Sequence, residues 1–95
     1  MSDQPTGLLS VLMDPTATLA ERDDAAMDLG DFDGALPNLI AVARDPDTPE
    51  LVATSCGTSI AEIWKRSGTF DRGVFNALPD TAQTEIVGLL NLRNN

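Results

Sequence analysis

The feature that most constrains this chain is an internal repeat. A shift of 31 residues superposes residues 8–15 on residues 39–46, apolar on apolar, and brings one Asp-Pro pair onto another. The same shift, without a gap, carries residues 25–32 onto residues 56–63. Repeats of about this length are typical of stacked helical units, each of which buries its apolar face against its neighbour. We therefore expect units at about residues 6–30, 35–65 and 70–92, the last of them degenerate because it caps the stack.

Apolar residues at helical spacing predict six helices and no strand. The expected helices cover about residues 6–13, 18–29, 35–44, 50–65, 71–78 and 80–92. Proline disfavours helical geometry in the residue before it, so Asp14-Pro15 and Asp45-Pro46 are expected to end the first and third helices. Gly30 and Gly68 are expected to end the second and fourth, Gly30 in a left-handed cap. The sequence thus predicts one all-α domain over residues 1–95, a short α-solenoid of three antiparallel helix pairs.

One stretch carries a family resemblance. The run Leu29-Gly30-Asp31, Ala35-Leu36-Pro37-Asn38-Leu39-Ile40 and Arg44-Asp45-Pro46-Asp47 resembles the HEAT-like repeats of bacterial proteins, including those called lyase-type HEAT repeats. In that pattern the first motif ends a hairpin, the second begins a helix and the third forms the corner. The resemblance covers residues 8–64 and is weak beyond them. The chain departs from the family pattern in one place. HEAT-like repeats usually carry a Val-Arg pair early in the second helix, whereas this chain has Glu21-Arg22 and Leu51-Val52 there. The resemblance implies a solenoid that binds other proteins.

Negative charge is concentrated in one part of the chain. The net charge is −9, and the segment 14–50 holds ten acidic residues against two basic ones, whereas four acids balance four bases from Glu62 onward. Such a field repels nucleic acids and anionic membranes and speeds encounter with basic proteins. The alternative that the acidity serves only solubility remains open.

Residues for catalysis or metal binding are few. The chain has no histidine, and its single cysteine, Cys56, lies on an apolar helix face where we expect a core residue. No glycine-rich phosphate loop is present. The segment Asp31-x-Asp33-Gly34 is similar to a calcium loop, but an EF-hand register would place Leu29 and Ile40 at ligand positions, so a turn is the better interpretation. We expect no enzymatic activity, no cofactor and no metal site.

Two expectations concern location and the single tryptophan. The apolar stretches are shorter than a membrane span, and the first residues lack the features of a signal peptide, so we expect a cytoplasmic protein without membrane contact. Trp64 could anchor a partner, but its place at the end of an apolar stripe favours the core.

The predicted binding site lies on the second helices of the repeat units, which a solenoid aligns along one surface. Its residues are those expected outside the core: Glu21, Asp24, Asp28, Asp31, Asp33, Ser55, Thr58, Ser59 and Glu62. This acidic, hydroxyl-rich patch predicts a basic protein partner, in its most specific form a cationic toxin that the chain neutralises as an immunity protein. One alternative is an accessory or chaperone-like subunit of a lyase or another enzyme complex. Another is a stacking module that forms a weak homodimer.

Overall fold

Prolines and glycines divide the chain into helices largely as the sequence predicts. The computed structural model describes residues 5–92, which contain helices and turns and no strand. The elements are α1 (Thr6–Met13), α2 (Leu19–Asp28), η1 (Leu29–Asp31), η2 (Asp33–Ala35), α3 (Leu36–Arg44), α4 (Glu50–Ser67), α5 (Arg72–Ala77) and α6 (Asp80–Leu90), where η marks a 3₁₀ turn. The expected all-α class is confirmed. Within this range no helix combines the length and the apolarity needed to cross a bilayer.

The two Asp-Pro corners repeat the same hydrogen bonds. Each aspartate carboxylate accepts from the backbone N–H two residues later, Asp14 from Thr16 at 2.8 Å and Asp45 from Asp47 at 2.9 Å. Each aspartate N–H donates to the carbonyl three residues earlier, at 3.2 Å in both corners. The hydroxyl and N–H of Thr16 hold the pKa of Asp14 below its ordinary value. At these two corners, the 31-residue correspondence in sequence is therefore also a correspondence in local structure.

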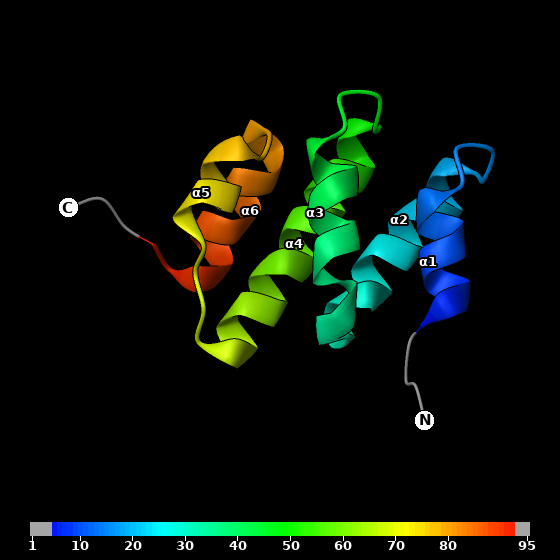
Figure 1. Cartoon of the computed structure of the whole chain (residues 1–95). Helices are drawn as coiled ribbons and strands as arrows, with labels where there is room; N and C mark the ends of the chain where they lie inside the picture. The colour runs from blue at the N-terminus through cyan, green and yellow to red at the C-terminus, as the bar shows by residue number, and fades with distance from the viewer. Residues whose placement is uncertain (1–4, 93–95) are drawn as a thin grey trace.

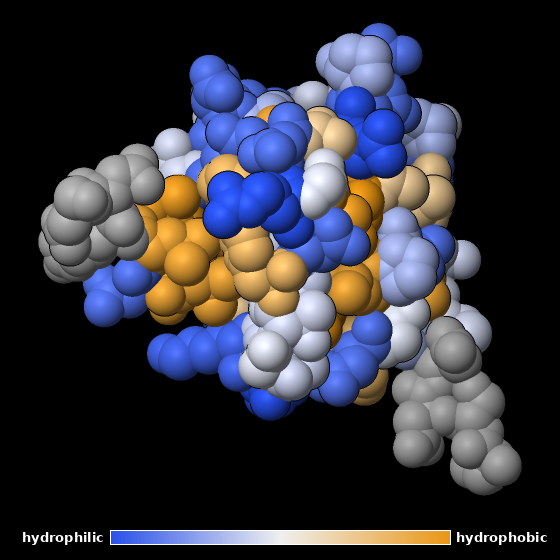
Figure 2. Space-filling model, turned by 60° about the vertical axis from the view of Figure 1, so that its left-hand side comes forward, coloured by the Kyte–Doolittle hydropathy of each residue, from blue (hydrophilic) through white to orange (hydrophobic). Residues whose placement is uncertain are grey.

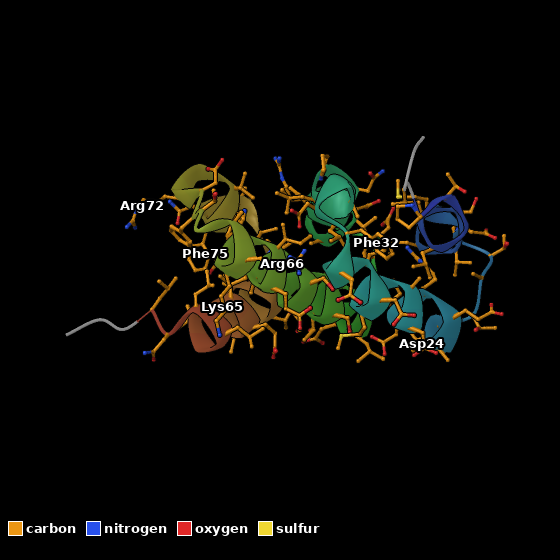
Figure 3. All side chains as sticks on the ribbon, turned by 90° about the horizontal axis from the view of Figure 1, so that it is seen from below. Asp24, Phe32, Lys65, Arg66, Arg72 and Phe75 are labelled. Carbon is orange, nitrogen blue, oxygen red and sulfur yellow. The ribbon has the colours of Figure 1, made fainter. Side chains whose placement is uncertain are left out.

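The helices lie in two rows, with α1, α3 and α5 in one and α2, α4 and α6 in the other (Figures 1 and 3). Helix α4 is central, because it packs on α2, α3 and α6. Its residues 53–59 are all small, which lets neighbouring helices approach closely. At Gly57 a Cβ atom would lie 2.6 Å from the Cα of Ala82 in α6, so only glycine permits this crossing.

Trp64 belongs to the core, as expected. Its side chain is 2% exposed, and its ring meets that of Phe70 edge-on at a centroid distance of 5.3 Å. Phe70 in turn packs on Phe75 of α5 at 5.4 Å, so this aromatic row attaches the short α5 to α4. Cys56 is fully buried, also as expected.

The prediction for Gly30 is wrong. Gly30 lies inside η1 and not in the left-handed region, which among the described residues only Gly68 (φ 69°) and Asn91 (φ 58°) occupy. Glycine is required at position 30 because α4 passes close to it. A Cβ there would lie 2.9 Å from the Ser59 hydroxyl oxygen and 3.2 Å from the Ser59 Cα. Helix α4 ends at Gly68 as predicted, and there the glycine forms the left-handed cap.

Apolar surface remains on the side formed by α5 and α6 (Figure 2). Val87, Leu89 and Leu92 are each more than a third exposed there. Helix α6 packs mainly on α4, which leaves these residues in contact with solvent.

Candidate functional site

Five exposed carboxylates form one acidic surface along α2 and the turns that follow it. We call this set the acidic surface; it consists of Glu21, Asp24, Asp28, Asp31 and Asp33. Helix α2 carries the first three, η1 carries Asp31 and η2 carries Asp33. Figure 3 shows Asp24 on the outer side of α2, away from the other row of helices. All five predicted residues are exposed and follow one another along α2, η1 and η2.

Three of the five carboxylates contribute nothing evident to the fold. Asp24, Asp28 and Asp31 have no hydrogen bond or ion pair within residues 5–92. Asp24 and Asp28 lie one helical turn apart, where like charges repel. Asp28 also ends α2 and Asp31 follows it, although the C-terminal end of a helix favours cations, and α2 has no basic residue in its last turn. Their placement works against helix stability.

The other two carboxylates have structural partners. Glu21 forms a capping box with Thr18: its carboxylate accepts from the Thr18 N–H at 2.9 Å, and its own N–H donates to the Thr18 hydroxyl at 3.1 Å. Asp33 forms a salt bridge with Arg66, which also donates to the carbonyl of Gly30 at 2.8 Å. Arg66 thereby ties the η1–η2 segment to the end of α4. Both carboxylates remain exposed, so they still add to the negative field.

Ser55 and Ser59 lie between α2 and α4 and not on an exposed surface. Ser55 is 7% exposed and donates to Asp23, while Ser59 is fully buried and donates to the carbonyl of Ala26. Both hydroxyls are used within the fold, where a buried polar group needs a partner. This differs from the expectation that the two serines face a partner. They hold α2 against α4 instead.

Thr58 and Glu62 differ in how far they reach the acidic surface. Thr58 is half-buried and donates to Glu85 of α6 at 3.1 Å. Glu62 is exposed, and its carboxylate lies directly over Gly30. Glu62 is therefore the one predicted residue of α4 that the structure brings to the edge of the acidic surface.

Sequence reasoning missed the carboxylates of Asp23 and Glu85 as partners of the α4 hydroxyls. The signal available was the run of small residues at 53–59. Small side chains through the middle of a helix indicate close packing on more than one side. Hydroxyls in such a stretch are expected to bond to neighbouring helices and not to a ligand.

Cys56, the single cysteine of the chain, is buried and poorly placed to act as a nucleophile. Burial raises the pKa of the Cys56 thiol to about 12, so the reactive thiolate is scarce at neutral pH. Nor do residues 5–92 bring together three or more acidic or cysteine side chains that could hold a metal ion. The carboxylates of the acidic surface produce a negative field, which attracts positive charge.

The chain matches no protein-family model, and comparisons with curated proteins and with solved structures found no similar chain. The resemblance to HEAT-like repeats rests on the residues quoted above.

Proposed function

We propose that this protein binds a basic protein through its acidic surface. The observation that carries the proposal is a set of carboxylates on α2 and η1 that have no partner within residues 5–92, Asp24, Asp28 and Asp31. They lie where the helix gains no stability from them, so an external cation explains their placement better than folding does. Carboxylates arranged in this way accelerate association with a positively charged protein.

The surface is also held in shape before a partner arrives. The capping box fixes the start of α2, and the buried serine hydroxyls fasten α2 to α4. Arg66 fixes the turns that carry Asp31 and Asp33. A rigid surface loses little conformational entropy on binding, which favours affinity.

The arrangement of the helices supports a HEAT-like solenoid as the scaffold for this surface. The two corners share their hydrogen bonds at the repeat spacing, and α2, α4 and α6 pack in sequence along one row. We infer three antiparallel helix pairs, the third of them shortened at α5. Solenoids of this kind present extended surfaces to protein partners.

The most specific form of the proposal is an immunity protein that neutralises a cationic toxin such as a nuclease. Small size and concentrated negative charge suit this role, because an inhibitor of a nucleic-acid enzyme can cover the basic surface on which the substrate binds. A neighbouring gene that encodes a basic C-terminal toxin domain would identify the partner to test.

The test is a charge reversal on the acidic surface. We expect Asp24→Lys/Asp28→Lys to slow association with the basic product of the neighbouring gene about tenfold or more at low salt. Association rates are measured by surface-based interferometry at two ionic strengths. The variant is expected to fold, because Asp28→Lys places a cation at the C-terminal end of α2. Circular dichroism checks this.

The matched control compares single reversals. Asp24→Lys and Asp47→Lys change the net charge equally, but Asp47 is exposed at the α3–α4 corner, outside the acidic surface. Only Asp24→Lys should slow association strongly. Equal effects of the two variants, or an unchanged rate in the double variant, would show that binding does not use the acidic surface.

A further inference from the structure

A groove lies outside the acidic surface, between the α3–α4 corner and the α5–α6 corner. Its volume is about 490 Å³, and its lining comes from two segments more than 20 residues apart, 43–53 and 77–81. Alanines 43, 53 and 77 supply apolar lining together with Leu78 and Pro79. In Figure 1 these two corners stand side by side at the upper end of the molecule.

Helix α5, at whose C-terminal end the groove lies, is short and lies apart from α3. Helix α5 has 6 residues, whereas α3, its neighbour in the same row, has 9. Helix α3 packs on α4 and also meets α1, but α5 makes little contact with it. The end of α3 and the start of α4 therefore face the α5–α6 corner across the groove.

The charges around the groove are mostly negative. Asp45, Glu50 and Asp80 line it, against one cation, Arg44. All four side chains are exposed, and none of them forms an ion pair within residues 5–92. An apolar lining with an excess of carboxylates matches the two parts of a lysine or arginine side chain, whose aliphatic stem packs on apolar surface while its charged end stays near water and acids.

We propose that this groove binds a lysine- or arginine-bearing segment of a protein partner. The inference rests on the proposed function in taking the partner to be basic, but it assigns a second contact away from α2. The stem of the basic side chain packs against Ala53 and Ala77. Its cationic end lies near Glu50 and Asp80, at the first turns of α4 and α6.

The test uses a blocked pentapeptide in which two lysines flank an alanine, and a control peptide with glutamine in place of each lysine. Amide chemical shifts of the full chain are followed during titration. We expect saturable shifts at residues 43–53 and 77–81 with the lysine peptide and none with the glutamine peptide. We expect Glu50→Gln/Asp80→Asn to weaken this binding about five- to tenfold, because two exposed charge interactions are lost.

Two further variants make the outcome decisive. Asp24→Asn/Asp28→Asn removes the same amount of charge from the acidic surface and should leave the groove shifts unchanged. Ala77→Phe fills the groove without altering charge; Ala77 is exposed, so the fold tolerates the larger ring, and the groove shifts should disappear. Shifts confined to α2, equal losses in the two charge variants, or persistent groove shifts in Ala77→Phe would overturn this inference. Shifts confined to α2 would leave the proposed function standing.

Discussion

Small and polar residues of α4 have roles set by neighbours distant in sequence. The Ser59 hydroxyl donates to the Ala26 carbonyl, 33 residues earlier. Position 30 must be glycine because a Cβ there would overlap Ser59. At this scale the environment of a side chain decides its chemistry, and Cys56 gives a direct test.

The Cys56 thiol should react very slowly in the folded protein. Its pKa is raised from 9.0 to about 12 by burial, so at pH 8 the thiolate fraction is lower by about a thousandfold than in an exposed cysteine. A chromogenic disulfide reagent should therefore label the native protein slowly and the urea-unfolded protein rapidly. Rapid stoichiometric labelling in native buffer would contradict the burial of Cys56 in the α4 interface.

Residue roles were predictable where the cause was local and unpredictable where it was not. Cys56 and Trp64 follow an apolar stripe in one helix, so their burial could be predicted. The left-handed conformation of Gly68 also follows from its place after a helix. The burial of Ser55 and the reason for glycine at position 30 could not be predicted. Both depend on contacts between α4 and the segment of α2 and η1, which lie far apart in the chain.

At the scale of the helix, the ends were the most predictable feature. Proline ends α1 and α3 by restricting the residue before it, which needs no tertiary contact. The groove beside α5 was not predictable. Its two sides come from segments far apart in the chain, and no local signal marks these segments as neighbours.

The crossing of α4 and α6 provides a prediction about packing. Gly57→Ala should destabilise the protein by about 1–3 kcal/mol, because the added Cβ would overlap the backbone of Ala82 and force the helices apart. Urea unfolding followed by circular dichroism measures the change.

Gly88→Ala is the matched control on α6. Gly88 is exposed and has no atom near the position of a Cβ, so the same substitution should stabilise the protein by about 0.5–1 kcal/mol through helix propensity. A stability loss of similar size in both variants would mean that close packing at Gly57 is not the cause.

For the whole molecule, the main energetic feature is its unbalanced charge. A net charge of −9 with a single salt bridge among residues 5–92 leaves repulsion largely uncompensated. Added salt should therefore raise the melting temperature. Between about 0.01 M and about 0.15 M NaCl the screening length falls from about 30 Å to about 8 Å, which weakens this repulsion.

Differential scanning fluorimetry across that salt range measures the effect. Asp24→Asn/Asp28→Asn should melt at a higher temperature at low salt and respond less to added salt, since two neighbouring charges are gone. A melting temperature that falls with salt would show that attractive charge pairs dominate the fold.

The salt bridge between Arg66 and Asp33 has a consequence for selectivity. Its guanidinium is tethered to the same molecule, so it occupies Asp33 at a high effective concentration that a free monovalent ligand cannot match. A single amine or a simple metal ion therefore competes poorly at this carboxylate. Asp24, Asp28 and Asp31 have no such internal cation within residues 5–92, so an external cation meets them without first displacing one.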